Sequence, residues 1–417
     1  MFTRISYFAE GAFGFFLPLA IALFGVNHRW SIAATLLAML FGLIAVLLKQ
    51  NQIEIEQKKW LKISFAGILF FSVAVWLGLW FHDSNIRLYD NYSRLFFLSP
   101  LVFLLVKLNL PRRNLYLGFL IGVAAIFYNA LTYSDNWGGR AIFTYYNALA
   151  MSNVAGEFLA ITAAIFLFAK KGALFATVSL VLAACLFVVV IMTGTKGVWL
   201  TVLTICMLAF FSLNTFKKRF LLIALFVSLS AIVNYATNNM PVKRISVAMD
   251  SVSCLFSSDN KLECGGSSVM ERASMWVFVA KSFPDAPFLG HGGQNFYTNL
   301  EKAAKAGVVP EKHRARNNPH NDFAKLLYDF GLIGLFALIV LFSSLLVIAK
   351  RVISIERSVG GFWGYALLLH TVFSIELGLT QSNFAVASQS FQFAFFTLLL
   401  LGLAIRSISN KAPLNFH

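Results

Sequence analysis

The stretch Asn317-Asn318-Pro319-His320-Asn321-Asp322-Phe323 marks the point where a long polar segment runs back into an apolar one. Asn is a favourable N-cap and Pro is tolerated at the first helical position, so Asn318 and Pro319 predict a helix that begins here. His320 would then lie in the first helical turn, where the helix dipole disfavours a protonated imidazole. A neutral histidine can act as a general base. The alternative is a capped loop histidine that makes only a structural hydrogen bond.

The composition is that of a membrane protein. Of the 417 residues, 59% are hydrophobic and only 12% are charged, whereas a soluble domain carries about 25% charged residues. A net charge of +16 would suggest nucleic acid in a soluble chain. Here the basic residues lie mainly in short connections between apolar runs, where they set membrane topology, so we expect no nucleic-acid partner. No cleavage site follows the first apolar run, which we expect to be retained as a span.

Twelve apolar runs are long enough to cross about 30 Å of hydrocarbon. They lie roughly at residues 12–26, 31–48, 61–81, 94–108, 114–132, 147–169, 173–192, 197–213, 220–236, 323–349, 360–380 and 384–405. We therefore predict an all-α polytopic membrane protein with about 12 transmembrane helices. Because the number is even, both termini lie on the same side of the membrane.

The basic residues indicate which side that is. If the termini and every second loop are cytoplasmic, those segments hold 18 Lys and Arg residues. The short outer loops then hold five: Arg29, Arg87, Arg94, Arg140 and Lys196. The positive-inside rule thus places both termini in the cytoplasm. It divides the chain into nine spans at 1–236, a large extracytoplasmic loop with short helices at 237–322, and three spans with a cytoplasmic tail at 323–417.

The large loop contains two of the four cysteines, Cys254 and Cys264. In an oxidising compartment, two cysteines at this spacing can form a disulfide that closes a small hairpin. We expect this disulfide from the context, since the spacing alone does not decide between bonded and free thiols.

A helix is predicted later in the large loop, directly after the capping box Ser268-Val-Met-Glu271. Met275, Trp276 and Val279 lie on one side of it, and Pro284 ends it. This pattern predicts an amphipathic helix on or in the membrane surface. Arg272 would face either a cleft or, as an anchor that snorkels, the lipid headgroups.

Two further stretches carry candidate residues. In Gly290-His291-Gly292-Gly293-Gln294, the glycines permit close approach to a ligand, although no strand precedes them and no Gly-Lys-Ser/Thr follows. His291 is a second candidate base, held less firmly than His320. Lys196 opens the apolar run at 197–213, and a helix N-terminus beside a lysine can bind an anion. The alternative is a tight loop with a lipid-facing lysine.

The outward acidic residues show no Asp-x-Asp or His-x-x-Glu cluster. Hard divalent cations need several oxygen ligands gathered together, so we expect a metal-independent site without a cofactor. Transporters often show broken helices and paired half-repeats near the membrane midplane. The candidate residues gather on the outer face instead, which disfavours a transporter or flippase.

Several features together resemble the O-antigen ligase and polymerase superfamily, and most closely the lipopolysaccharide O-antigen ligases. They are the twelve runs, the large loop between the ninth and the tenth, Arg272-x-x-x-Trp276, Pro287-Phe-Leu-Gly-His-Gly-Gly293, and His320-Asn321 followed by Gly331-Leu-Ile-Gly334. The architecture covers the whole chain, and the similarity in sequence covers roughly 190–335. The resemblance implies a glycosyltransferase of C-type architecture in the bacterial inner membrane, with a periplasmic active site.

The resemblance also implies roles for single residues. His320 matches an essential histidine proposed to act on the acceptor hydroxyl, and Arg272 matches an arginine proposed to hold the diphosphate. Lys196 stands where the family usually has arginine, so bidentate phosphate geometry is lost. We expect Arg140 to be a further contact at the outer face. Acceptor or loop contacts are expected from His291, Gln294 and Asn321.

The reaction that the resemblance implies belongs to lipopolysaccharide biosynthesis. A finished glycan moves from undecaprenyl diphosphate to an outer-core sugar of lipid A–core, with inversion and without metal. The partners are therefore the lipid-linked glycan, lipid A–core and membrane lipids. The alternatives are an O-antigen polymerase or a protein-glycosylating ligase of the same superfamily, and, from another class, a membrane transporter or flippase.

Overall fold

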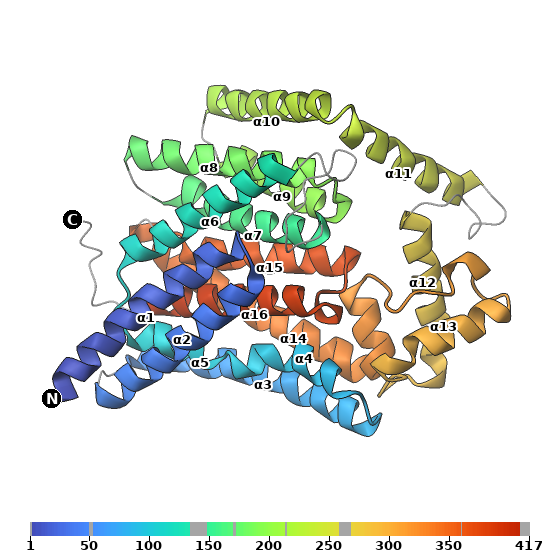
Figure 1. Cartoon of the computed structure of the whole chain (residues 1–417), viewed down its shortest axis with the longest axis horizontal. Coiled ribbons are helices and arrows are strands. Elements are labelled where there is room, and N and C mark those ends of the chain that lie inside the picture. Colours follow the sequence, from blue (N-terminus) through green and yellow to red (C-terminus); the bar gives the residue numbers. More distant parts are fainter. Residues whose placement is uncertain are drawn as a thin grey trace.

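The structure is a computed structural model that describes residues 2–49, 53–133, 148–169, 172–212, 215–257, 268–359 and 361–408. These residues form sixteen α-helices, joined by turns and short 3-10 segments (Figure 1). The first ten helices are α1 (Phe2–Phe24), α2 (His28–Leu48), α3 (Ile55–Phe81), α4 (Ile86–Phe97), α5 (Pro100–Lys107), α6 (Arg112–Tyr133), α7 (Ala148–Phe168), α8 (Ala173–Met192), α9 (Lys196–Ser212) and α10 (Phe216–Ala236). The remaining helices are α11 (Met240–Ser257), α12 (Ser268–Ser282), α13 (Phe296–Lys305), α14 (Asp322–Val359), α15 (Trp363–Thr380) and α16 (Ala387–Arg406).

Nine helices in the described part of the chain are long and apolar enough to cross a membrane. They are α1, α2, α3, α6, α7, α8, α10, α14 and α16, whereas α9 is apolar but shorter. The chain is therefore a multi-pass membrane protein, as predicted. The twelve predicted runs all fall on helices, but the count of twelve spans stays a prediction.

The predicted span at 94–108 is wrong as a single helix. The chain turns at Leu98 and Ser99, which separate α4 from α5. Pro100 opens α5, because proline has no N–H to donate into a continuing helix and suits the first helical position.

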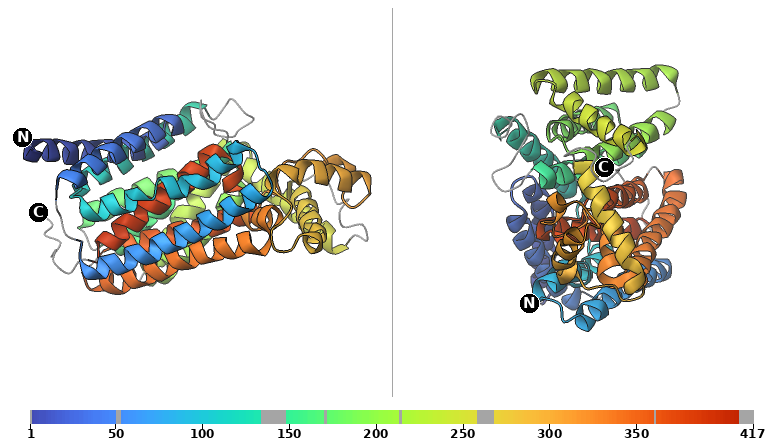
Figure 2. Two further views of the ribbon diagram at one scale, coloured as in Figure 1. Left: turned by 90° about the horizontal axis from the view of Figure 1, so that it is seen from below. Right: turned by 90° about the vertical axis from the view of Figure 1, so that its right-hand side faces the viewer.

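The long helices run side by side, and the two ends of this bundle differ (Figure 2). The start of α1 and the end of α16 lie near one end, and α12 and α13 lie at the other, which we call the loop end. α16 and α7 are the most enclosed of these nine helices. In their most apolar 18-residue stretches, 94% and 83% of the residues are buried, whereas only 6% are buried in the corresponding stretch of α10. The core therefore lies around α7, α15 and α16, and α10 is peripheral.

A buried set of polar side chains ties three of the central helices together. Nδ1 of His370 in α15 lies 2.8 and 2.9 Å from the two carboxylate oxygens of Glu157 in α7. Its Nε2 lies 2.8 Å from Oγ1 of Thr397 in α16. Both ring nitrogens are thus satisfied, as buried polar groups require, and the contacts fix how α7, α15 and α16 meet.

α14 is kinked at Gly331, where the backbone has φ 62° and ψ −155°. The Pro287–Gly293 segment packs against the kink and satisfies its backbone groups. The Leu332 N–H donates to the Pro287 carbonyl at 2.8 Å, and the His291 N–H donates to the Tyr328 carbonyl at 2.7 Å. A Cβ atom on Gly331 would lie 2.4 Å from the Phe288 carbonyl carbon. The glycines of this motif therefore permit close backbone packing.

Candidate active site

At the loop end, α12, α13 and the first turns of α14 share a small hydrophobic core of their own. Its buried members include Met275, Phe278, Phe296, Leu300 and Tyr328. The ring centroids of Phe278 and Phe296 lie 5.6 Å apart, and those of Phe296 and Tyr328 lie 5.0 Å apart. Met275 and Val279 of α12 are therefore buried within the protein, and the predicted place of this helix on or in the membrane surface stays a prediction. The side of α12 that carries these two residues packs on α13 and α14, which periodicity within one helix does not reveal.

α12 is attached to the segment before α14 by three contacts along its length. They are an ion pair between Arg316 and Glu271, a 3.0 Å hydrogen bond between Nδ1 of His313 and Oγ of Ser274, and a 2.9 Å hydrogen bond from Nε1 of Trp276 to the Pro319 carbonyl. The last contact explains the Arg272-x-x-x-Trp276 spacing, because residues four apart share a helix face. Because Trp276 binds Pro319, the residue before His320, Arg272 lies on the side of α12 that faces this segment.

His320 lies outside α14, so its predicted place in the first helical turn is wrong. Its backbone has φ 50°, a left-handed conformation that few residues other than glycine adopt. Its N–H donates to Oδ1 of Asn318 at 3.0 Å, so Asn318 closes a turn before the helix. A residue in this conformation projects from the loop and not from the helix surface.

Asn321 is the residue that caps α14. Its Oδ1 accepts a 2.9 Å hydrogen bond from the Ala324 N–H, the N-cap arrangement. The same residue binds the connection between α15 and α16: its N–H donates to Oγ of Ser382 at 3.1 Å, and its Nδ2 donates to the Leu379 carbonyl at 3.2 Å. These tertiary bonds select Asn321 over Asn318 as the cap. Its predicted acceptor contact stays a prediction.

The electrostatic surroundings of His320 favour a neutral ring. Burial lowers the pKa of His320, and the positive charges of Arg272 and Arg316 lower it further, against the opposing effect of Glu271. The neutral state was predicted from the helix dipole, but the causes here are desolvation and neighbouring cations. Among the described residues, no side chain forms a hydrogen bond with a ring nitrogen of His320, so the lone pair of the unprotonated nitrogen is available.

Arg272 and Lys196 supply positive charge at the same place. Lys196 opens α9, just before its apolar stretch, and its pKa is lowered by burial and by the charge of Arg272. Burial also lowers the pKa of Arg272. Within the described ranges, neither cation forms an ion pair with a carboxylate, whereas Arg316 beside them is paired with Glu271. Two half-buried cations that form no ion pair can bind an anion, although Glu271 raises the pKa of Arg272 against the effect of burial.

The structure gives two other predicted residues internal partners. Nε2 of His291 lies 2.8 Å from the Ser282 carbonyl, so it carries a proton and donates it, and the ring stacks on Tyr328. Gln294 donates to the His82 carbonyl at 2.8 Å and accepts from the Asn85 N–H at 3.1 Å. Both side chains hold the glycine-rich loop in place, which leaves His320 as the better base. Their acceptor contacts stay predictions.

Two predicted residues, Arg140 and Cys264, lie outside the described residues. Cys254 lies in α11, while Cys185 and Cys206 are free thiols. The disulfide between Cys254 and Cys264 and the contact from Arg140 therefore stay predictions.

Charged residues that follow His320 are buried in α14. Nζ of Lys325 lies 2.6 Å from Oδ2 of Asp329, which also accepts a 3.4 Å hydrogen bond from the hydroxyl of Tyr92. Asp322 accepts from Nδ2 of Asn383 at 2.9 Å. Asp322, Lys325 and Asp329 share a face of α14, and because they pair within the protein they stabilise the start of this helix next to His320.

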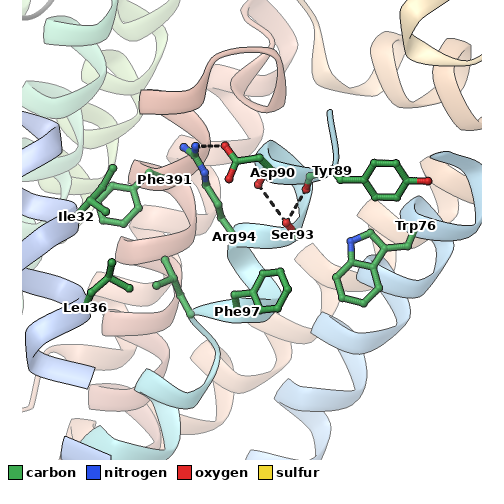
Figure 3. Close-up of a pocket in the computed structure, with 10 residues that line it drawn as sticks. Ile32, Leu36, Trp76, Tyr89, Asp90, Ser93, Arg94, Phe97 and Phe391 are labelled. Atoms are coloured by element: carbon green, nitrogen blue, oxygen red, sulfur yellow. Dashed lines mark hydrogen bonds and ion pairs between the residues drawn. The ribbon is translucent and has the colours of Figure 1, made fainter. Parts of the chain in front are cut away.

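A cavity of about 580 Å³ lies elsewhere, among α2, α3, α4 and α16 (Figure 3). Most of its lining is apolar, and the ion pair between Asp90 and Arg94 lies beside it. Arg94 also donates to the Ala387 carbonyl, so its guanidinium group already has partners within the protein. None of the predicted site residues lines this cavity.

The histidine with its two cations falls within a segment that matches a known family. Residues 180–339 match the family model described as O-Antigen ligase. This segment is therefore similar to the O-antigen ligase superfamily. The matched O-antigen ligase segment includes Lys196, Arg272 and His320. The members are membrane proteins that act as glycosyltransferase-like ligases on lipid-linked glycans.

A similar protein comes from Haemophilus influenzae. It is 25% identical over 344 residues, which cover 78% of this chain and 80% of that protein, and its name is given as "Uncharacterized protein". The similarity therefore extends well beyond the O-antigen ligase segment, but it adds no activity.

Sequence reasoning missed the residues that hold the site together. Trp276 was noted on the apolar side of a predicted helix and as part of a motif, but its bond to Pro319 and the roles of Arg316 and Ser382 were not foreseen. For Trp276 the i, i+4 spacing from Arg272 was a usable signal. Ser382 carried no signal, because its contact with Asn321 joins positions 61 residues apart.

Proposed function

We propose that this protein is an O-antigen ligase, which transfers a glycan from undecaprenyl diphosphate to an outer-core sugar of lipid A–core. The reaction takes place on the periplasmic face of the bacterial inner membrane, needs no metal and inverts the anomeric centre. One observation carries the proposal: a neutral His320 with a free ring nitrogen lies near Arg272, Arg272 lies near Lys196, and neither cation forms an ion pair with a carboxylate in the described part of the chain.

This arrangement suits displacement at a sugar bound to diphosphate. His320 takes the proton of the acceptor hydroxyl, because a sugar hydroxyl is a weak nucleophile until a base acts on it. The acceptor oxygen attacks the anomeric carbon from the face opposite the diphosphate, and the bond from that carbon to the phosphate oxygen breaks. Its electrons stay on the departing diphosphate, whose developing charge Arg272 and Lys196 stabilise.

The test is transfer in vitro with purified protein, undecaprenyl-diphosphate-linked glycan, lipid A–core and EDTA. We expect a glycan–lipid A product that persists in EDTA and is absent with Arg272→Ala. Longer lipid-linked ladders that form without lipid A–core would show a polymerase instead. If neither product forms under conditions in which a known ligase works, the proposal fails.

A further inference from the structure

A pair of buried amides lies between α7 and the outer ends of α9 and α15. Nδ2 of Asn153 in α7 donates to Oε1 of Gln381, directly after α15, at 3.1 Å, and both residues are only 1% exposed. The second polar atom of each amide, Oδ1 of Asn153 and Nε2 of Gln381, has no hydrogen-bond partner in the described part of the chain. The buried hydroxyl of the neighbouring Ser152 is likewise unpartnered there.

The position of Gln381 connects the two halves of the candidate active site. A Cβ atom on Gly197, the residue after Lys196, would lie 2.3 Å from Oγ1 of Thr380 and 3.6 Å from Nε2 of Gln381. On its other side, Ser382 accepts from the N–H of Asn321, the residue after His320. The free Nε2 of Gln381 therefore lies beside the first turn of α9, which Lys196 opens, and the next residue, Ser382, contacts the segment that carries His320.

Unpartnered buried polar atoms are uncommon because each one loses its hydrogen bonds to water without replacement. A ligand that supplies the missing partners recovers this free energy. The nitrogen and oxygen of a side-chain amide exchange places when the amide group rotates by half a turn. If both amides rotated in this way, one donor and one acceptor would still be free. The pair therefore suits a group that both accepts and donates.

This pattern selects among the chemical groups of a lipid-linked glycan. Diphosphate oxygens only accept, so the free Oδ1 of Asn153 would face negative charge without a hydrogen atom between them. A sugar hydroxyl or an acetamido substituent both donates and accepts. Since Lys196 and Arg272 take the diphosphate, the group beside them is the sugar joined to it.

We propose that Asn153 and Gln381 bind a hydroxyl or acetamido substituent of the first sugar of the glycan donor, the sugar attached to the diphosphate. The proposal rests on the proposed function for the identity of the donor. The amide pair binds a substituent of the sugar, and Arg272 and Lys196 bind the diphosphate. Selectivity for the first sugar therefore depends on Asn153 and Gln381, whereas affinity for the lipid carrier does not.

The experiment compares the Kd of purified full-length protein for two probes, undecaprenyl diphosphate and undecaprenyl-diphospho-N-acetylglucosamine. We expect the wild type to prefer the sugar-bearing probe. Gln381→Met keeps the side-chain length but removes the amide, and it should reduce this preference by about fivefold, the effect of one lost hydrogen bond. The Kd for undecaprenyl diphosphate should stay within about twofold. Lys196→Met should weaken the binding of both probes.

Asn153→Leu tests the second amide and keeps the inference testable if Gln381→Met does not fold. The matched control is Gln57→Met, because Gln57 is also buried and lies near the opposite end of the bundle, where it donates to the Arg406 carbonyl. An unchanged preference in both site variants, or the same loss in Gln57→Met, would overturn the inference. So would a change confined to the KM for lipid A–core, which would assign the amides to the acceptor.

These outcomes are separate from the fate of the proposed function. If the wild type transfers no glycan but Gln381→Met still removes the sugar preference, the ligase assignment fails and the sugar site stands. If transfer is observed and the preference does not change, only the sugar site fails.

Discussion

The hydrogen bond from Trp276 to the Pro319 carbonyl should set the position of His320. Trp276→Phe keeps an aromatic ring and deletes only the indole N–H that donates at 2.9 Å. The two other ties of α12 to this segment remain, so the loop should stay attached and the protein should stay folded. The variant isolates the contact closest to the proposed base.

The size of the effect follows from the bond that is lost. One neutral hydrogen bond contributes about 1 kcal/mol, which corresponds to about fivefold in an equilibrium or a rate. We therefore expect kcat/KM for glycan transfer to fall about fivefold. The free energy of unfolding should change by no more than about 1 kcal/mol. Trp80→Phe is the matched control, because Trp80 is 72% exposed near the end of α3 and should leave the rate unchanged.

A double-mutant cycle separates a positioning role from a general loss of structure. If Trp276 acts through His320, Trp276→Phe should have no further effect on the residual rate of His320→Asn. The reasoning is refuted if Trp276→Phe keeps the wild-type rate, or if it lowers the rate by the same factor in both backgrounds.

Three further predictions follow from the same contacts. Because burial and cations lower the pKa of His320 below its usual 6.5, kcat/KM should be flat from about pH 7.5 to 6.5 and fall only at lower pH. Arg316→Gln removes one of these cations and should move the decline to higher pH. A decline that begins above pH 6.5 in the wild type would contradict the assignment. Lys196→Met should lower kcat about 100-fold while Lys196→Arg retains most of it; equal rates for both would exclude a charge role. Gly331→Ala, which combines a positive φ with a 2.4 Å contact, should lower the free energy of unfolding by about 2 kcal/mol or more in a detergent melt, and an unchanged melting temperature would refute the packing role of the kink.

Much of the helical framework was accessible from hydropathy, because the membrane requires long apolar runs whose backbone is satisfied internally. The break at Pro100 was also present in the sequence, as a proline inside a predicted span. The start of α14 was not predictable in the same way. Asn317, Asn318 and Asn321 all suit an N-cap, and hydrogen bonds to Ser382 and Leu379 decide among them.

The candidate site was predictable in its chemistry but not in its assembly. His320, Arg272 and Lys196 were singled out from residue type and resemblance, and in the structure Arg272 lies close enough to both of the others to lower their pKa values. The amide pair of Asn153 and Gln381 was not singled out, because its partners are 228 residues apart. Only the fold shows that a donor and an acceptor remain free there.

His320 is the proposed general base of glycan transfer. His320→Asn tests it most directly, because asparagine tolerates the left-handed backbone at this position but does not act as an equivalent base, and His291→Asn is the matched control. We predict that purified His320→Asn binds undecaprenyl diphosphate with a Kd within about twofold of the wild type and forms the glycan–lipid A product about 100-fold or more slowly. Transfer by His320→Asn at the wild-type rate would contradict the account.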